Sequence, residues 1–519
     1  MFKFDNSYIH LGDKFFQRAL PQKVSKPALL LWNSELANNL HISSSLQDNH
    51  NLLAQYFSGS KVLTGSQSIA LAYSGHQFGH FNPQLGDGRA HLLGEVLDVN
   101  NVRRDIQLKG SGQTAFSRRG DGKCALAPAL REYIMSEALY ALGTPTARCL
   151  AVVSTGEVIN RGTAKAGAVV SRVAASHIRV GTFQYFAVRR DLTSLASLLD
   201  YSIDRHFPEI ENANECQEQR ILLFLEKTLD KQISLIIEWL RIGFIHGVMN
   251  TDNTAICGET IDFGPCAMMG SYDEKAVFSS IDEYGRYAFG NQGKIAQWNM
   301  ARLADSLLPL LINHSIESDE NQSDEEALQQ QALTKLEFVI HQFNDKFNQA
   351  YYAMYAGKLG VVDVNNTNIA LIDVLLEIMQ KQGLDYTQTF YRLTQSLFNP
   401  MIADELRKEL GQWYEGWLKA LKQEHNATKK VYAEVASTIM NKSNPIVIPR
   451  NHHVENILTQ CENVIADDSL QQSASERVGV IVETFLKVLR SPYREIDTTK
   501  EYQDVAEDGD KYYQTFCGT

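Results

Sequence analysis

The chain has 519 residues, of which 44% are hydrophobic and 21% charged, a composition typical of a globular protein that folds in water. This length suggests one large bilobal unit or two to three domains. The formal net charge of −12 argues against binding to duplex nucleic acid, which requires a basic face to neutralise the phosphates.

The beginning of the chain and its cysteines favour a cytoplasmic protein. The first residues, MFKFDNSYIH, lack the basic start and apolar run of a secretory signal. The most apolar stretch is interrupted by Glu238, Arg241 and His246, so no membrane span is expected. The seven cysteines include no CxxC pair, so neither a zinc site nor a secreted disulfide framework is expected.

Residues 1–79 are predicted to form an N-terminal extension, and residues 80–184 a mixed α/β lobe that is rich in glycine and arginine. The segment QLGDGRAHLLGEV (84–96) places Gly86 and Gly88 in a turn before an alternating strand. Glycines allow backbone N–H groups to approach a phosphate closely, although most turns of this kind are purely structural.

A strand over DIQLKG (105–110) carries Lys109 near its end, where a cation can reach phosphates. The predicted helix that follows, ALAPALREYIMSEALYALG (125–143), contains Glu132, 23 residues after Lys109, and also Glu137. In protein kinases a strand lysine is held by a helix glutamate, and this pair positions the phosphates. The spacing favours Glu132 as the partner, with Glu137 as the competitor.

Several cationic residues surround these two elements. The segment SRRGDGK (117–123) is locally basic, and its Asp121 and Gly122 indicate a turn. Arg172 and Arg179 lie further along among apolar neighbours, where an unpaired charge would be costly. Arginine binds phosphate oxygens with two parallel hydrogen bonds, so both are candidates for phosphate contacts.

Residues 185–490 are predicted to form a mainly helical lobe, and its most informative segment is GFIHGVMNTDNTAICGETIDFGP (243–265). Asn253 follows His246 by seven residues, and a D-F-G sequence begins at Asp262, which matches the spacing of metal-binding residues in protein kinases. TAICGETI (254–261), with Gly258 near its turn, is predicted to be a hairpin that brings Asn253 and Asp262 together. Such oxygen ligands suit Mg²⁺ or Mn²⁺.

The segment departs from the kinase pattern at one position. Val248 stands two residues after His246, where a kinase has its catalytic aspartate. Asp252 is the nearby carboxylate that can replace it. The sequence therefore predicts a kinase-like fold that has lost its activity or performs altered chemistry.

Taken together, these segments resemble the selenoprotein O family. The matching segments are SGHQFGHFNPQLGDGRA, LKGSGQTAFSRRGDGKCAL, VSRVAASHIRVGTF, GFIHGVMNTDN, IDFGP and NPIVIPRNHHVE, with FCGT at the end. The resemblance implies an α+β fold with two protein-kinase-like lobes, flanked by an N-terminal extension and by a polar tail over residues 491–519. It also implies that ATP binds in a flipped orientation and that AMP, or UMP from UTP, is transferred to hydroxyl groups of proteins, the enzyme itself included.

The same resemblance implies a role for each matching residue. Asp252 would accept the proton, Glu132 would hold Lys109, and Asn253 and Asp262 would bind the metal. The nucleotide would contact Gly86, Gly88, Arg89, Lys109, Asp121, Gly122, Arg172, Arg179 and Asp262. No membrane or nucleic-acid partner is implied.

Two other functions remain open on the residues alone. One is an ordinary phosphotransferase with Asp252 as the base, and the other is a nucleotide-binding scaffold without catalytic activity. A redox role is a further hypothesis, because Cys517 lies in a polar tail predicted to be mobile and Cys266 directly follows the D-F-G-P sequence.

Overall fold

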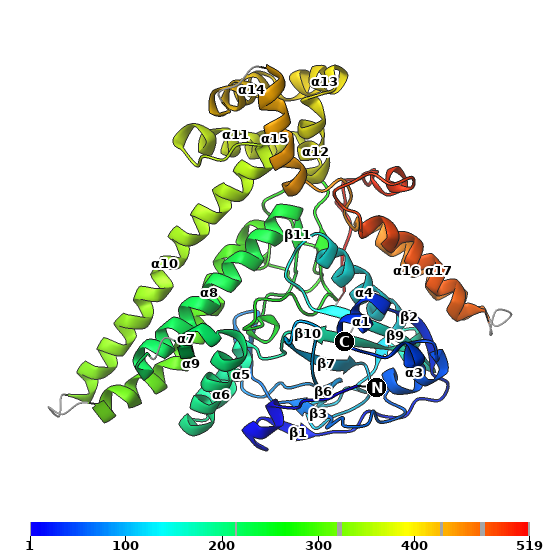
Figure 1. The fold of residues 1–519 in the computed structure, drawn as a ribbon, viewed down its shortest axis with the longest axis vertical. Coiled ribbons are helices and arrows are strands. Elements are labelled where there is room, and N and C mark those ends of the chain that lie inside the picture. Colours follow the sequence, from blue (N-terminus) through cyan, green and yellow to red (C-terminus); the bar gives the residue numbers. More distant parts are fainter. Residues whose placement is uncertain (1, 213–214, 319–323, 426–428, 468–472, 517–519) are drawn as a thin grey trace.

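The computed structural model describes residues 2–212, 215–318, 324–425, 429–467 and 473–516. An antiparallel sheet dominates the N-terminal part, and helices form most of the C-terminal part (Figure 1). The predicted order, a mixed α/β part followed by a mainly helical part, is confirmed.

The main sheet has eight strands, and every neighbouring pair in it is antiparallel. In spatial order the strands are β1 (Phe16–Arg18), β3 (Ile69–Leu71), β6 (Ala90–Leu97), β7 (Arg103–Lys109), β10 (Ala164–Ala174), β9 (Arg148–Asn160) and β2 (Ala28–Trp32), with β8 (Cys124–Ala125) beside β10. Two short pairs lie apart, β4 (Gly75–Gln77) with β5 (His80–Asn82) and β11 (Phe244–Ile245) with β12 (Ala267–Met268).

Residues 1–79 do not form a separate extension, which corrects the expected boundary at residue 80. They supply β1 and β2, the two outer strands of the main sheet, together with β3. The short apolar runs of β2 and β3, ALLLW and IAL, lose contact with water when they pair with the sheet, which favours their incorporation.

Side chains on β7 alternate between the two faces of the sheet, as strand geometry requires. Ile106 and Leu108 are fully buried in a core formed with the N-terminal helices α1 (Ser34–Asn39) and α3 (His50–Phe57). Gln107 and Lys109 therefore point to the opposite face. A single strand thus contributes to the core and carries polar side chains toward the candidate site.

Helix α4 (Leu126–Ala141) covers that opposite face and is buried along most of its length. It packs on β9 and β10 on one side and on α16 (Asn451–Ala466) and α17 (Ala474–Leu489) on the other (Figure 1). Gly143 has the left-handed φ of +85° that the sequence predicted for a residue ending this helix.

The described chain contains twelve further α-helices. They are α2 (Ser44–Gln47), α5 (Val180–Val188), α6 (Leu192–His206), α7 (Pro208–Asn212), α8 (Gln217–Ile242), α9 (Gln292–Ser318), α10 (Glu325–Leu359), α11 (Asn366–Gln382), α12 (Tyr386–Ser396), α13 (Pro400–Leu410), α14 (Gln412–Glu424) and α15 (Lys429–Ser443). Short 3₁₀ turns are η1 (Tyr8–Leu11), η2 (Thr251–Asn253), η3 (Phe289–Asn291) and η5 (Thr499–Tyr502).

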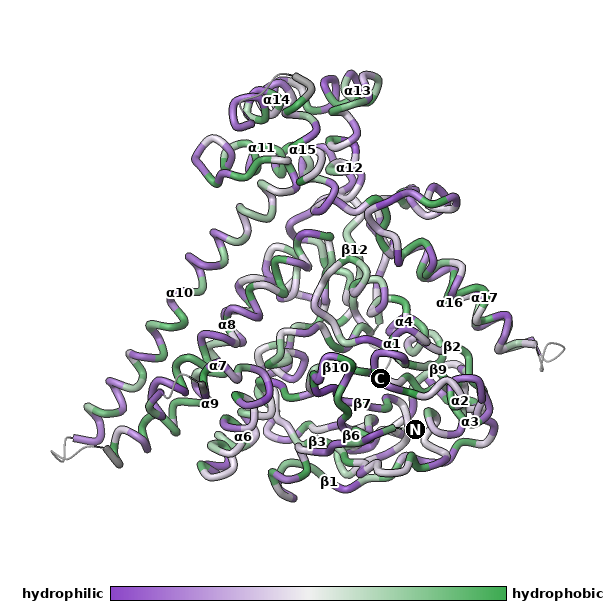
Figure 2. The backbone as a smooth tube through the Cα atoms, viewed as in Figure 1, coloured by the Kyte–Doolittle hydropathy of each residue, from purple (hydrophilic) through white to green (hydrophobic). Residues whose placement is uncertain are grey.

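Helix α8 ends at Ile242 and is capped by Gly243, which has a left-handed φ of +76°. Helix α9 reaches Ser318, and α10 begins at Glu325. Figure 2 shows hydrophilic and hydrophobic residues mixed along the long helices. Within the described residues, no helix is long and apolar enough to cross a membrane.

The described part of the C-terminal tail is docked, which corrects the prediction of a mobile tail. The Thr515 backbone exchanges hydrogen bonds with Phe278 and Ser280, and its hydroxyl donates to the Pro265 carbonyl at 2.7 Å. The tail therefore ends beside the segment that contains the D-F-G sequence.

Candidate active site

A cavity of about 820 Å³ lies between the sheet and the segment from Val248 to Asp262. Its walls come from the glycine turn before β6, from β7 and β10, from the loop after β7, from the start of α5 and from η2. It is lined by eleven of the twelve predicted site residues: Gly86, Gly88, Arg89, Lys109, Asp121, Gly122, Arg172, Arg179, Asp252, Asn253 and Asp262. The twelfth, Glu132, lies behind Lys109.

A network of buried ion pairs forms the inner wall. The Lys109 Nζ atom lies 2.8 Å from Glu132 Oε2 and 2.7 Å from Asp262 Oδ1. Arg172 contacts Glu132 through Nε and through Nη2, the latter at 3.1 Å, and its Nη2 lies 3.4 Å from Asp262 Oδ1. Two cations therefore share two carboxylates at the end of β7.

The competing glutamate has a partner elsewhere. Glu137 accepts two hydrogen bonds from the Arg148 guanidinium, at 2.9 and 2.6 Å. The spacing argument therefore identified the correct partner of Lys109.

Burial alone would raise the pKa values of both carboxylates in the network, but the neighbouring cations reverse this effect. Arg172 and Lys109 lower the pKa of Glu132 to about 2. Lys109, Arg172 and Arg89 hold the pKa of Asp262 far below its ordinary value. Both groups are therefore ionised at neutral pH.

The glycine turn is closely covered by the loop after β7. A Cβ atom at Gly86, where φ is +87°, would lie 2.3 Å from the Phe116 ring, and one at Gly88 would lie 2.9 Å from the Phe116 carbonyl oxygen. At Gly122 a Cβ would lie 2.1 Å from the Gly112 backbone. These glycines are thus required for packing, whatever ligand the turn approaches.

Arg179 occupies the N-cap position of α5 and projects into the cavity. Its guanidinium stacks over Tyr73 at 4.2 Å, and its Nη1 lies 3.4 Å from Asp87 Oδ1. The buried Nε atom has no hydrogen-bond partner. The sequence analysis missed Asp87 and Tyr73, although the position of Asp87 between Gly86 and Gly88 could have indicated it.

Asp121 forms an ion pair with an arginine that the sequence analysis also missed. Arg161, in the turn between β9 and β10, donates to both carboxylate oxygens at 2.7 and 2.8 Å. This hydrogen bonding lowers the pKa of Asp121 to about 2. Since Asp121 is an anion, it can accept hydrogen bonds from a nucleoside but cannot attract a phosphate.

The two predicted metal ligands present oxygen atoms toward the cavity. Asn253 uses its side-chain nitrogen to donate to the Val248 carbonyl at 3.0 Å, so its side-chain oxygen is the atom suited to a cation. Asp262 has a left-handed φ of +64°, and such strain in a non-glycine residue is typical of functional sites. His246 contacts the Ile261 carbonyl at 2.9 Å and helps to hold this backbone in place.

The predicted hairpin between these two residues is wrong. Residues 255–258 form a turn closed by a hydrogen bond from the Gly258 N–H to the Ala255 carbonyl, at 3.1 Å. Ala255 and Thr260 then pair with other parts of the chain, Arg179 and Thr146 respectively. The segment is fixed by this external pairing, which local sequence periodicity does not reveal.

Asp252 lies in η2 in an unusual environment. Its Oδ2 accepts a hydrogen bond from Gln77 at 3.2 Å, whereas its buried Oδ1 has no partner. Burial raises the pKa of Asp252 to about 6, against the lowering effect of Arg179. A carboxylate with a free oxygen and a pKa near neutrality is suited to accepting a proton.

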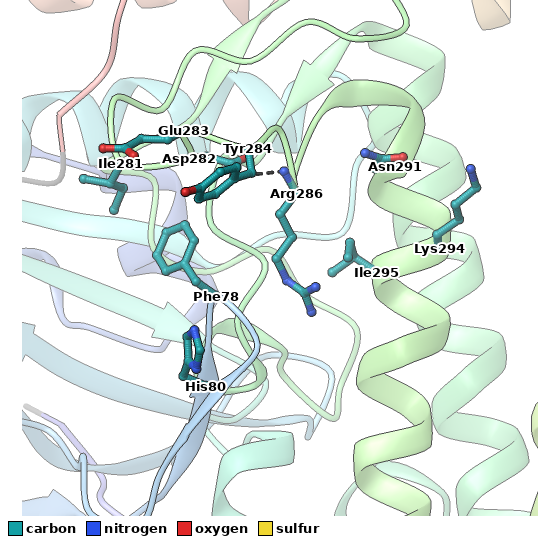
Figure 3. Close-up of a pocket in the computed structure, with 10 residues that line it drawn as sticks. All are labelled: Phe78, His80, Ile281, Asp282, Glu283, Tyr284, Arg286, Asn291, Lys294 and Ile295. Atoms are coloured by element: carbon teal, nitrogen blue, oxygen red, sulfur yellow. Dashed lines mark hydrogen bonds between the residues drawn. The ribbon is translucent and has the colours of Figure 1, made fainter.

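A second cavity of about 560 Å³ adjoins the first and shares Phe78 and Ile281 with it. Figure 3 shows the Phe78 ring near Tyr284, with Arg286 and Lys294 along the same wall. The Tyr284 side chain is 95% exposed. This cavity has a mixed lining, with the cations Arg286 and Lys294, the carboxylates of Asp282 and Glu283, and apolar side chains.

The two cysteines of the redox hypothesis differ in what can be described. Cys266 is fully buried, its Sγ contacts the Phe263 carbonyl at 3.1 Å, and burial raises the pKa of its thiol to about 12. Such a thiol is a poor nucleophile. Cys517 lies outside the described residues.

Comparison with known proteins gives one consistent result. The family described as Protein adenylyltransferase SelO matches residues 1–476. A protein of Teredinibacter turnerae named Protein nucleotidyltransferase YdiU is 47% identical over 514 residues, covering 99% of both chains. Proteins of the same name from Pseudoalteromonas translucida and Bradyrhizobium diazoefficiens are 46% and 45% identical, with 99% or more of both chains covered.

Proposed function

The chain belongs to the protein adenylyltransferase SelO family of protein nucleotidyltransferases, and we propose that its larger cavity binds ATP or UTP with the triphosphate reversed relative to protein kinases. The nucleoside monophosphate then passes to a hydroxyl group on a protein, and pyrophosphate leaves. This proposal assigns the sheet-containing part and the helical part to the two lobes of a kinase-like fold.

One observation carries the proposal: the carboxylate of this segment stands at a different position from the catalytic aspartate of the kinase pattern. Val248, at the kinase base position, is apolar and buried, whereas Asp252 has a free carboxylate oxygen and a pKa raised to about 6. Asp252 therefore takes the proton from the acceptor hydroxyl. The acceptor oxygen attacks the α-phosphorus, and the bond from that phosphorus to the bridging oxygen breaks.

The distribution of cations supports the reversed orientation. Lys109 and Arg172 lie deep in the cavity and are buried, and Arg179 is also buried within its wall. A terminal phosphate directed inward would meet these charges and place the α-phosphate nearer Asp252. Fixed cations also stabilise the negative charge that develops as pyrophosphate leaves.

Asn253 and Asp262 fit a divalent cation, Mg²⁺ or Mn²⁺, because both offer oxygen donors at the cavity wall. Such an ion would neutralise phosphate charge. In the described structure Asp262 is bonded to Lys109 at 2.7 Å. Nucleotide binding therefore exchanges this contact, with Lys109 turning toward phosphate oxygens.

The smaller cavity is proposed as the place where the acceptor protein docks. It opens beside Asn250 and Asp252 through the shared residues Phe78 and Ile281. Tyr284→Ala should raise the KM for a protein acceptor while leaving nucleotide affinity unchanged. Equal KM values in the parent and the variant would remove this docking assignment.

The proposed reaction is tested by following two labels of ATP separately. Label on the α-phosphate should appear on protein, the enzyme itself included, and label on the γ-phosphate should not. Transfer of the γ-label alone would replace the proposal with an ordinary phosphotransferase. Nucleotide binding without transfer of either label, with Mg²⁺ or Mn²⁺ present, would indicate a scaffold.

A further inference from the structure

Two consecutive histidines at the start of α16 face one carboxylate from the C-terminal tail. His453 Nε2 lies 2.6 Å from Asp504 Oδ1, and His452 Nε2 lies 3.5 Å from Asp504 Oδ2. The two imidazole rings are 4.1 Å apart. One donor atom from each of the three residues can be chosen so that all lie within 4.8 Å of one another.

The His452 side chain is 31% exposed, but both of its ring nitrogens are covered by the surrounding chain. Neither nitrogen has a hydrogen bond of ordinary length, and Nε2 has the 3.5 Å contact with Asp504 Oδ2. A neutral imidazole carries one N–H donor and one acceptor, and buried polar groups of this kind are nearly always satisfied. A covered ring nitrogen with only a 3.5 Å contact to a carboxylate, beside a second imidazole, is suited to a ligand that both side chains can bind.

We propose that His452, His453 and Asp504 bind a divalent transition-metal ion, with Zn²⁺ as the best fit. Two imidazole nitrogens and one carboxylate oxygen form a common donor set for this ion. Tetrahedral ligands at about 2.0–2.1 Å from zinc lie roughly 3.3 Å from one another. The two histidines lie 2.6 and 3.5 Å from the two different carboxylate oxygens of Asp504, so small side-chain rotations suffice to bring the three donors to that spacing.

The surroundings favour a cation at this place. The neighbouring basic side chain of Arg450 is already paired with both carboxylate oxygens of Asp385, at 2.8 and 3.0 Å. Asp510 interacts electrostatically with His452 and adds negative charge. The absence of CxxC pairs excluded only cysteine-based zinc sites, so it does not bear on this donor set.

The site would connect the tail to the candidate active site. Asp504 follows η5, and further along the tail the Tyr513 hydroxyl donates to Glu455 of α16 at 2.7 Å. The Thr515 hydroxyl then donates to the Pro265 carbonyl at 2.7 Å, directly after the D-F-G sequence. An ion that binds the folded state alone stabilises it by mass action, so Zn²⁺ would hold this tail in its docked position.

The test compares metal-stripped full-length protein with two variants, Asp504→Asn and His452→Gln. Zn²⁺ is titrated by calorimetry in saturating Mg²⁺, which occupies oxygen-rich sites. The parent should bind one more equivalent of Zn²⁺ than either variant, or bind it at least about 10-fold more tightly, since even residues outside the ligand shell change affinity 10–100-fold. Histidine His50, which is exposed, supplies the matched control His50→Gln.

Three further measurements separate this site from other effects. Co²⁺ should give the visible absorption of a four-coordinate ion in the parent and not in Asp504→Asn, whose metal-free melting temperature should match the parent. Zn²⁺ should slow tryptic cleavage after the exposed Lys500 and Lys511 in the parent alone. Asp262→Ala should still bind the additional equivalent of Zn²⁺. This result would separate the zinc site from the proposed transferase activity. Equal stoichiometry and affinity in the parent and both variants would overturn the proposal.

Discussion

Replacing Asp252 with asparagine should make the protein more stable and less active at the same time. Burial raises the pKa of Asp252 from 3.8 to about 6, so the folded state at neutral pH holds a carboxylate that would be more stable in water. This difference corresponds to roughly 3 kcal/mol at 1.36 kcal/mol per pKa unit. Asp252→Asn should recover up to about that free energy above pH 6.

The sign follows from proton binding. Between about pH 4 and 6 the folded parent binds a proton at Asp252 that the unfolded chain has released. The contribution of Asp252 to the free energy of unfolding therefore decreases as pH rises. The stability difference between variant and parent should therefore grow from about pH 4 to pH 6 and stay constant above that. Urea unfolding at several pH values measures it.

Activity should move in the opposite direction. Loss of a general base costs about 10²–10⁴-fold in rate. In the parent, the ionised fraction of a group with a pKa of about 6 falls from about 90% at pH 7 to about 10% at pH 5, so kcat/KM should fall roughly tenfold. Pyrophosphate release provides the assay.

Two controls identify the group responsible. If protonation of the triphosphate causes the loss of activity at low pH, the residual activity of Asp252→Asn should still fall as pH decreases. If titration of Asp252 causes it, the residual activity of this variant should not fall. Glu259→Gln removes another carboxylate, whose pKa is raised to about 7 by burial. The activity of this variant should still decrease at low pH, as in the parent. A variant that is less stable than the parent, or one that retains the parent's rate, would refute the reasoning.

Three other substitutions or treatments have expected outcomes. Asp262→Ala should lower transfer by roughly 10²–10³-fold, or about 3–4 kcal/mol, with an unchanged circular dichroism spectrum; near-normal transfer with Mg²⁺ or Mn²⁺ would rule out its assignment as a metal ligand. Arg179→Ala should weaken nucleotide binding and transfer together, because a phosphate clamp acts in both the ground and transition states, and calorimetry with a non-hydrolysable analogue separates the two effects. Iodoacetamide should label the exposed Cys216 and leave the buried Cys266 unlabelled in native protein, as peptide mass spectrometry would show, whereas rapid labelling of Cys266 would reveal an opening motion.

Some parts of this structure are encoded locally and could be predicted from the sequence. The Lys109–Glu132 pair follows from a strand, a helix and a spacing of 23 residues, and glycine stops define the ends of α4 and α8. Pattern and composition were sufficient because each of these features depends on residues close together in the chain.

Other parts depend on contacts between distant segments. The pairing of Ala255 with Arg179, the incorporation of β2 beside β9, and the contact of Thr515 with Pro265 join residues far apart in sequence. Arg161 reaches Asp121 across 40 residues, from a turn whose sequence resembles any exposed turn. Sequence periodicity does not indicate such contacts. The hairpin over residues 254–261, the separate N-terminal extension and the mobile C-terminal tail were therefore predicted wrongly.

The orientation of the nucleotide is the central claim, and a crystal structure with a non-hydrolysable ATP analogue and Mg²⁺ tests it most directly. The terminal phosphate should contact Arg172 or Arg179 at the inner wall, and the α-phosphorus should be the phosphorus atom nearest the Asp252 carboxylate. A complex in which the γ-phosphorus lies nearest Asp252, with the base of the nucleotide directed inward, would contradict the account.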